Sequence, residues 1–88
     1  MTLKPIRFSI HAEERITARK LVHNTIEEVV RNPDQIVPDD DDANRQIYQS
    51  LIYGNEKPKL LRVVVEETTT EIVVISTYRT SQIKRYWR

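Results

Sequence analysis

Apolar and polar residues alternate over residues 6–10, Ile-Arg-Phe-Ser-Ile, as is typical of a short half-buried strand. Three more runs in the second half of the chain are rich in β-branched and aromatic residues, over Gln46 to Tyr53, Lys59 to Glu66 and Glu71 to Tyr78. Only short segments connect these three runs, and short connections favour antiparallel pairing. The second half is therefore predicted to form an antiparallel meander.

Two helices are predicted between the first strand and this meander. Residues 11–20 contain good helix formers and neither glycine nor proline. A second helix is expected to start at Asn24 or Thr25, because a glutamate follows each of them three positions later. Asn32-Pro33 is expected to end it. The pattern predicts an α+β fold, in which two N-terminal helices pack on one face of a mainly antiparallel sheet of three to four strands.

Length and composition narrow the class of protein. A chain of 88 residues has the size of one domain with a single core. It has no cysteine, which fits a reducing compartment, and cytoplasm is the expected location. Its longest apolar runs are far too short to span a bilayer, so no membrane association is expected. The sequence carries no zinc signature and no glycine loop for phosphates, and neither a metal nor a cofactor is predicted.

Charge is segregated along the chain although the formal net charge is only +1. Residues 32–44 contain five aspartates and no lysine or arginine, whereas residues 79–88 contain four basic residues and no acid. The four consecutive aspartates at 39–42 lack the glycine that a sharp hard-cation loop normally uses, so a solvated acidic loop is expected there. The basic tail predicts a surface that attracts anionic ligands.

The first predicted helix carries His11, Arg15 and Arg19 at intervals of four, which places them along one face. One interpretation is a phosphate-binding edge, with two arginines to neutralise charge and a histidine to exchange a proton near neutral pH. The alternative is a solvated helix face, in which Glu13 and Glu14 supply ion-pair partners.

The C-terminal tail combines basic and aromatic side chains. The basic residues Arg79, Lys84, Arg85 and Arg88 suit phosphate groups, and Tyr86 and Trp87 could stack on bases or pack into the core. A solvated, frayed terminus is the alternative. The phenol of Tyr78 ends the last predicted strand, where it could reach a ligand, while Thr80 and Ser81 could bind phosphate or cap a final helical turn.

The order of these features resembles a family of small bacterial domains of unknown function, which are similar to toxin-antitoxin ribonucleases of the RelE and BrnT type. The resemblance extends from Phe8 to Tyr86. It rests on four features: His11-Ala-x-x-Arg15-x-x-x-Arg19, the helix end from Glu27 to Pro33, Val63-Val-Val65, and Ile75-Ser-Thr-Tyr78.

The resemblance implies a single RelE-like domain over residues 1–88 that cuts RNA without a metal ion, with the neighbouring 2′-hydroxyl as nucleophile. It implies that His11 acts as acid or base and that Arg15 contributes to the catalytic group with Tyr78 and Lys84. It assigns RNA binding to a second set of residues, Arg19, Arg79, Arg85 and Tyr86.

Three hypotheses of function follow, of which the third is a degenerate family member with only a scaffold role. The leading hypothesis is an endoribonuclease toxin, whose partners would be RNA and a cognate antitoxin protein that covers the basic face. The alternative is a non-catalytic module of the same fold that binds RNA or a protein. Salt dependence separates phosphate binding from an apolar interface, and cleavage separates an enzyme from a binding protein.

Overall fold

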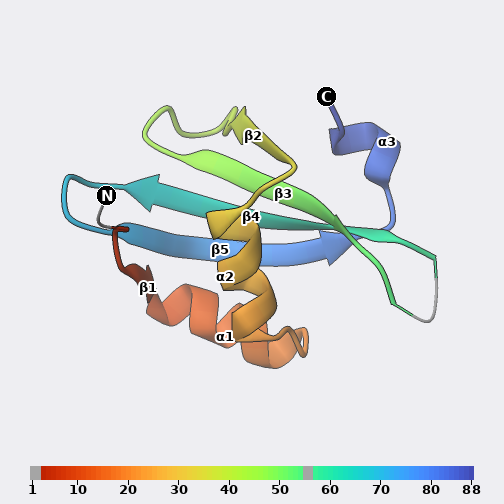
Figure 1. Ribbon diagram of the computed structural model, residues 1–88, viewed down its shortest axis with the longest axis horizontal. Coiled ribbons are helices and arrows are strands. Elements are labelled where there is room, and N and C mark those ends of the chain that lie inside the picture. The colour runs from red at the N-terminus through yellow and green to blue at the C-terminus, as the bar shows by residue number, and fades with distance from the viewer. Residues whose placement is uncertain (1–2, 55–56) are drawn as a thin grey trace.

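A computed structural model describes residues 3–54 and 57–88, and it places all its strands in one five-stranded sheet (Figure 1). The elements follow one another as β1 (Ile6–Phe8), α1 (Ile10–Ala18), α2 (His23–Arg31), β2 (Gln35–Pro38), β3 (Gln46–Ile52), β4 (Lys59–Glu67), β5 (Ile72–Thr80) and α3 (Ile83–Tyr86). The strand order is β1-β5-β4-β3-β2. β1 runs parallel to β5, and the other neighbouring pairs are antiparallel.

The α+β class and the antiparallel meander β3-β4-β5 are confirmed, but the prediction of three to four strands is wrong. The additional strand, β2, has four residues, of which only Val37 is buried, so it carries little alternation that the sequence could reveal. β1 was predicted as a strand, and the structure adds its parallel pairing, in which Ile6 lies opposite Ile72.

The hydrophobic core lies between one face of the sheet and the helices α1 and α2. Ala12 and Ile16 of α1, together with Ile26 of α2, pack against this face. The strands contribute apolar side chains at alternate positions, Leu61, Val63, Val65, Ile72 and Val74. This face is called the helix face below. Alternation of this kind is the expected outcome when one side of a sheet is buried by helices.

A β-bulge in the pairing of β4 with β5 sets which way the end of β5 faces. Val65 pairs with Val74, whereas Val64 pairs with Ser76, so Ile75 is the extra residue on β5. Beyond the bulge, Thr77 lies opposite Val63 and is fully buried. Tyr78 therefore points to the opposite side of the sheet, which is called the open face.

Both long helices have identifiable ends. The Ser9 side chain caps α1 by accepting a hydrogen bond of 3.0 Å from the Ala12 amide. At its other end the amides of Lys20 and Leu21 bond back to Thr17 and Ile16, and Lys20 adopts a left-handed φ of 54°.

The predicted start of α2 at Asn24 or Thr25 is wrong, because Val22 is the N-cap residue and the helix begins at His23. The His23 imidazole contacts Glu13 of α1 at 2.7 Å and packs edge-on against the Phe8 ring, and these contacts fix the first turn. The predicted end is confirmed, with Asn32 as the C-cap residue.

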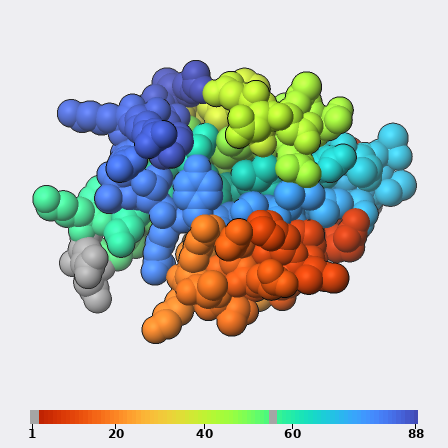
Figure 2. Space-filling model, turned by 180° about the vertical axis from the view of Figure 1, so that it is seen from behind, coloured from red at the N-terminus to blue at the C-terminus, as the bar shows by residue number. Residues whose placement is uncertain are grey.

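The open face is covered only in part. Figure 2 views the molecule from this side and shows α3 and the loop after β2 along one edge, α1 along the opposite edge, and the strands β4 and β5 between them. In Figure 1, α2 crosses in front of the sheet, on the face opposite to the one that Figure 2 shows, and α3 follows the end of β5.

In the parts of the chain that the structure describes, no helix has the length and apolar character needed to cross a membrane.

Candidate functional site

A row of four polar side chains crosses the open face from β2 to β5. In the register of the sheet, Gln35 lies opposite Gln49, Gln49 opposite Arg62, and Arg62 opposite Tyr78. Gln49 Nε2 donates to Gln35 Oε1 at 2.8 Å, and Arg62 Nε donates to Gln49 Oε1 at 2.9 Å. Arg62 Nη1 donates to Tyr78 Oη at 2.7 Å. These four residues form one hydrogen-bonded chain, called the polar row below.

Arg62 is the exceptional member of this row. Its relative exposure is 6%, yet no carboxylate within the described ranges 3–54 and 57–88 lies at ion-pair distance from its guanidinium. A guanidinium carries its charge throughout the physiological pH range. Burying a charge without a counter-ion is unfavourable. Nε and Nη1 are used within the row, and Nη2 makes no hydrogen bond to the described protein, so it can donate to an anion.

Two tyrosine rings partly compensate for the missing carboxylate. The Arg62 Cζ atom lies 4.1 Å from the centre of the Tyr86 ring and 5.8 Å from that of the Tyr78 ring. A cation above an aromatic face is attracted by its quadrupole, and the attraction strengthens when water is excluded. The rings themselves meet edge-on, with centres 6.4 Å apart. The result is a rigid, positively charged and aromatic surface.

The Tyr78 hydroxyl keeps its proton near neutral pH and can donate a hydrogen bond. Burial raises its pKa above the usual value for a phenol, and the hydrogen bond from Arg62 offsets part of that rise. The phenol is therefore protonated near neutral pH. Because its oxygen already accepts from Arg62, its O–H group can donate to a third partner.

The polar row also holds α3 in place. Gln49 Nε2 donates to the Tyr86 carbonyl at 3.1 Å. Gln35 accepts from the Arg88 amide at 3.1 Å and donates to the Arg88 carbonyl at 2.6 Å. The single turn of α3 has no side-chain cap of its own, so these contacts replace the stabilisation that a short helix lacks.

A pocket of 510 Å³ opens beside the row on the open face. Arg62 and two tail residues, Arg85 and Arg88, supply positive charge to its lining, and Tyr78 and Tyr86 supply its aromatic part. Ile47 and Val64 contribute apolar surface. This cavity is called the open-face pocket. Its combination of cations, phenols and apolar surface suits an anionic ligand that also carries a flat or apolar part.

The acidic loop forms the remaining wall of the open-face pocket, through Asp39, Asp40 and Asp41. The prediction of a loop here is confirmed, and its turns are held by side chains: Asp39 Oδ1 accepts from the Asp41 amide and Asp42 Oδ1 from the Asn44 amide, both at 2.9 Å. Asp40 lies 3.9 Å from Arg88 Nη2, too far for a hydrogen bond. Acidic and basic segments that are separate in sequence thus face each other across one pocket.

Among the predicted residues on α1, only Arg19 reaches this region. Arg19 Nη1 donates to the Thr77 carbonyl at 2.7 Å, and its Cζ lies 5.9 Å from the centre of the Tyr78 ring. His11 and Arg15 are exposed and contact each other, with Arg15 Nε donating to His11 Nε2 at 3.3 Å. Neither of them lines the open-face pocket.

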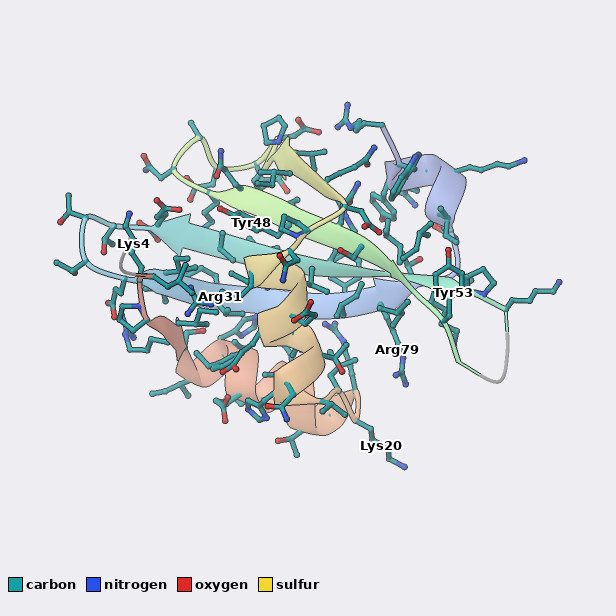
Figure 3. The ribbon with its side chains drawn as sticks, in the orientation of Figure 1. Lys4, Lys20, Arg31, Tyr48, Tyr53 and Arg79 are labelled. Atoms are coloured by element: carbon teal, nitrogen blue, oxygen red, sulfur yellow. The ribbon has the colours of Figure 1, made fainter. Side chains whose placement is uncertain are left out.

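The predicted tail residues fall on different sides of the sheet. Arg85 and Tyr86 line the open-face pocket. Arg79 lies on the helix face near Lys20 and Tyr53, where it projects away from α3 (Figure 3). Lys84 is exposed on α3 and is not part of the pocket lining. Thr80 accepts from the Gln82 amide at 3.0 Å, so it stabilises the turn that leads into α3.

Sequence reasoning missed the centre of the site. Arg62 interrupts an apolar run, Leu60-Leu-Arg-Val-Val-Val65, in a predicted strand. A lone charge in such a run is rare without a partner or a function, and this signal could have identified it. Gln35 and Gln49 carry no comparable signal, because glutamine is common on sheets and only the register aligns these two.

The sequence model of one family, described as a domain of unknown function (DUF4258), matches residues 8–79. The match includes Arg62 and Tyr78 and stops before α3. A search of curated proteins gave no match. A search of solved structures gave none either. The family match covers most of the chain, and the protein therefore belongs to the DUF4258 family.

Proposed function

We propose that this protein binds single-stranded RNA, with a backbone phosphate in the open-face pocket. The observation that carries the proposal is the buried Arg62 guanidinium, which has no carboxylate partner among the residues that the structure describes and whose Nη2 makes no hydrogen bond to them. A phosphate oxygen would supply the missing negative charge and accept from Nη2. Arg85 borders the same pocket and would hold a second phosphate oxygen.

The aromatic groups favour a nucleic acid over a simple anion. The ring of Tyr86 is fixed by Arg62 on the open face, next to the ring of Tyr78. Single-stranded nucleic acids are commonly bound by such a combination of basic groups along the backbone and aromatic rings that contact bases. The phosphate contacts make the expected affinity fall steeply as salt rises.

The test replaces Arg62 by methionine and measures RNA binding over a range of salt concentrations. We expect Arg62→Met to weaken binding at least about tenfold, since a hydrogen bond to a charged group contributes about 1.5–3 kcal/mol. The slope of log affinity against log salt should fall by about 0.7, the value for one phosphate contact on a single strand.

The matched control is Arg31→Met, which removes the same charge from the end of α2 on the helix face (Figure 3). It should leave the affinity nearly unchanged. Thermal unfolding of both variants checks that the fold survives, because a methionine of similar length preserves most of the packing around Arg62. Equal loss of binding in the two variants would show that net charge, and not the pocket, determines binding.

Tyr78 favours a second candidate function, metal-independent RNA cleavage. In that reaction the 2′-oxygen attacks the adjacent phosphorus, the bond from phosphorus to the 5′-oxygen breaks, and the 5′-oxygen takes up a proton. The O–H group of Tyr78, held beside Arg62, is suited to donate that proton, and Arg62 is suited to stabilise the charged phosphate. The proton of the 2′-hydroxyl would pass to a carboxylate of the acidic wall, since His11, the base predicted from the sequence, does not line the open-face pocket.

Cleavage is tested by incubating RNA with the protein in excess chelator and mapping the fragment ends. The expected products end in a 2′,3′-cyclic phosphate, and Tyr78→Phe should slow their formation by about 10²-fold or more, as is typical for loss of a proton donor. His11→Ala tests the base predicted from the sequence, because an unchanged rate would remove His11 from the mechanism. If RNA is bound but stays intact, the protein is a binding module. A cognate antitoxin that covers the open face remains a prediction.

A further inference from the structure

We propose that the open-face pocket selects a guanine base, whose Watson–Crick edge donates hydrogen bonds to the acidic wall while its phosphate lies on Arg62. This inference rests on the proposed RNA binding and adds a base preference to it. The argument depends on how charge is distributed in the pocket: Arg62 and Arg85 supply cations, and Asp39 to Asp41 form a wall beyond Ile47 and Val64, where Arg88 lies 3.9 Å from Asp40.

The fold itself fixes the position of the cation Arg62 in the pocket. Arg62 is 94% buried, as its relative exposure is 6%, and two hydrogen bonds of the polar row fix its orientation. Its position next to the pocket is therefore set by the strand register of β3, β4 and β5. An anionic group bound at Nη2 would have its remaining part directed into the open-face pocket.

The middle of the pocket suits a flat ring. Ile47 and Val64 line it together with Pro38, so a base can contact apolar surface between the cations and the acidic wall. The volume of 510 Å³ lies within the range of about 300–1,000 Å³ in which small ligands bind. A purine nucleotide has both the required anionic group and a ring that can reach beyond it.

The acidic wall distinguishes the four bases by their hydrogen-bonding edges. Guanine presents two adjacent donors, N1–H and the N2 amino group, which match the two oxygens of one carboxylate. Adenine and cytosine each present an amino group next to a ring nitrogen that accepts. Uracil presents one N–H between two carbonyls. An acceptor that faces a carboxylate is repelled, so guanine is favoured and the others are disfavoured.

Two carboxylates of the wall make no hydrogen bond to the described part of the protein. Asp40 forms only a long, exposed ion pair with Arg88, whose Nη2 lies 3.9 Å away. Asp41 is also exposed, and its amide rather than its carboxylate takes part in the turn. Asp39 uses one carboxylate oxygen to hold that turn, so it is kept intact in the test.

The experiment measures binding of short oligouridines that carry one central guanine, adenine or cytosine, and of an unsubstituted oligouridine. It compares the wild-type protein with the double variant Asp40→Asn/Asp41→Asn. The control is Glu27→Gln/Glu28→Gln, which changes the net charge by the same amount on α2, away from the open face. Guanosine 5′-monophosphate is included as a free nucleotide.

For the wild type we expect guanine to increase affinity about tenfold over the other bases, within the range for a bidentate base contact. The aspartate variant should lose this preference. It should also bind the unsubstituted oligouridine as tightly as the wild type or more tightly, since two repelling charges are removed from the pocket. The glutamate variant should keep the preference for guanine. In the aspartate variant, a lost guanine preference together with an unchanged or higher affinity for oligouridine would distinguish base recognition from a general effect of charge.

Three results would overturn the inference. If the wild type binds all the oligonucleotides equally, RNA binding stands and guanine selection is wrong. If the aspartate variant keeps the guanine preference, the acidic wall does not read the base. If guanosine 5′-monophosphate binds but no RNA does, the site is for a free nucleotide and the proposed RNA function fails as well.

Discussion

Lys20 occupies a backbone conformation that disfavours its side chain. It follows the last turn of α1 with a φ of 54°, where glycine is the usual residue. Lys20→Gly should therefore raise the free energy of unfolding by about 1 kcal/mol, measured by urea denaturation, because the clash between the β-carbon and the backbone disappears.

Lys20→Ala is the control for this prediction. Both variants remove the same positive charge, but alanine keeps the β-carbon that causes the strain. We expect Lys20→Ala to leave the stability close to that of the wild type. A similar gain in both variants would attribute the effect to charge instead of to backbone conformation.

Individual site residues could be predicted from the sequence only where their chemistry was conspicuous. Tyr78, Arg85 and Tyr86 were predicted as site candidates and do line one pocket. Arg79 was grouped with them as a basic residue of the tail, but successive residues of a strand point to opposite faces, and it lies on the helix face. Arg62 was not predicted, although its place in an apolar run was a signal, and its lack of a carboxylate neighbour among the described residues is a three-dimensional property that the sequence does not report.

At the scale of elements, α3 is held by contacts with other parts of the chain. Gln35 makes two hydrogen bonds to the backbone of Arg88. Gln35→Ala removes both, so α3 should detach more often while the sheet stays folded. Limited digestion with trypsin is expected to cut after Lys84 and Arg85 several times faster than in the wild type.

The control for this prediction is Gln46→Ala, an exposed position on β3 that makes no side-chain contact with α3 in the described part of the chain. Its tail should be cut at the wild-type rate. If Gln35→Ala also accelerates cleavage throughout the sheet, the glutamine stabilises the whole fold and not α3 in particular.

The elements with strong periodicity were predictable, and those defined by pairing were not. The runs that became β3, β4 and β5 carry their own alternating or β-branched pattern, and Asn32-Pro33 marks the end of α2. β2 is only four residues long, and it exists because β3 offers a free edge. The parallel pairing of β1 with β5 joins segments from opposite ends of the chain, which no local pattern reports.

At the scale of the whole molecule, two tyrosines link stability to alkaline pH. Burial raises the pKa of Tyr48 and of Tyr78 above 10.0, and Glu67 adds to the rise at Tyr48. Below the unfolded pKa of about 10, both phenols are protonated in the folded and unfolded states. Above it, the unfolded chain releases these protons while the folded protein retains them, so stability falls as pH rises.

The measurement is the free energy of unfolding between about pH 8 and pH 11, a range that brackets the phenol titration. In Tyr48→Phe the decline should be shallower than in the wild type, because one of the two retained protons is gone. An identical decline in this variant would show that other groups, such as lysines, account for the alkaline loss of stability.

The charge segregation seen in the sequence takes on a different meaning in the folded molecule. The acidic segment and the basic tail were expected to form separate surfaces, one solvated and one for ligands. Folding brings them to the two sides of the open-face pocket, with Asp40 near Arg88. The pocket is therefore dipolar, which explains why the net charge of the chain gives little information about its ligand.

The position of β5 in the sheet also determines when the pocket can form during synthesis. β2, β3 and β4 are made before β5 and can pair as a local meander, but β1, although it is made earlier, must wait for β5, since Ile6 pairs with Ile72. Tyr78 and α3 arrive with or after that last strand. In a nascent chain that has been synthesised only as far as β4, Arg62 lacks both Tyr78, which accepts its hydrogen bond, and Tyr86, whose ring packs against it. The ligand site can therefore form only after β5 and α3 have been synthesised.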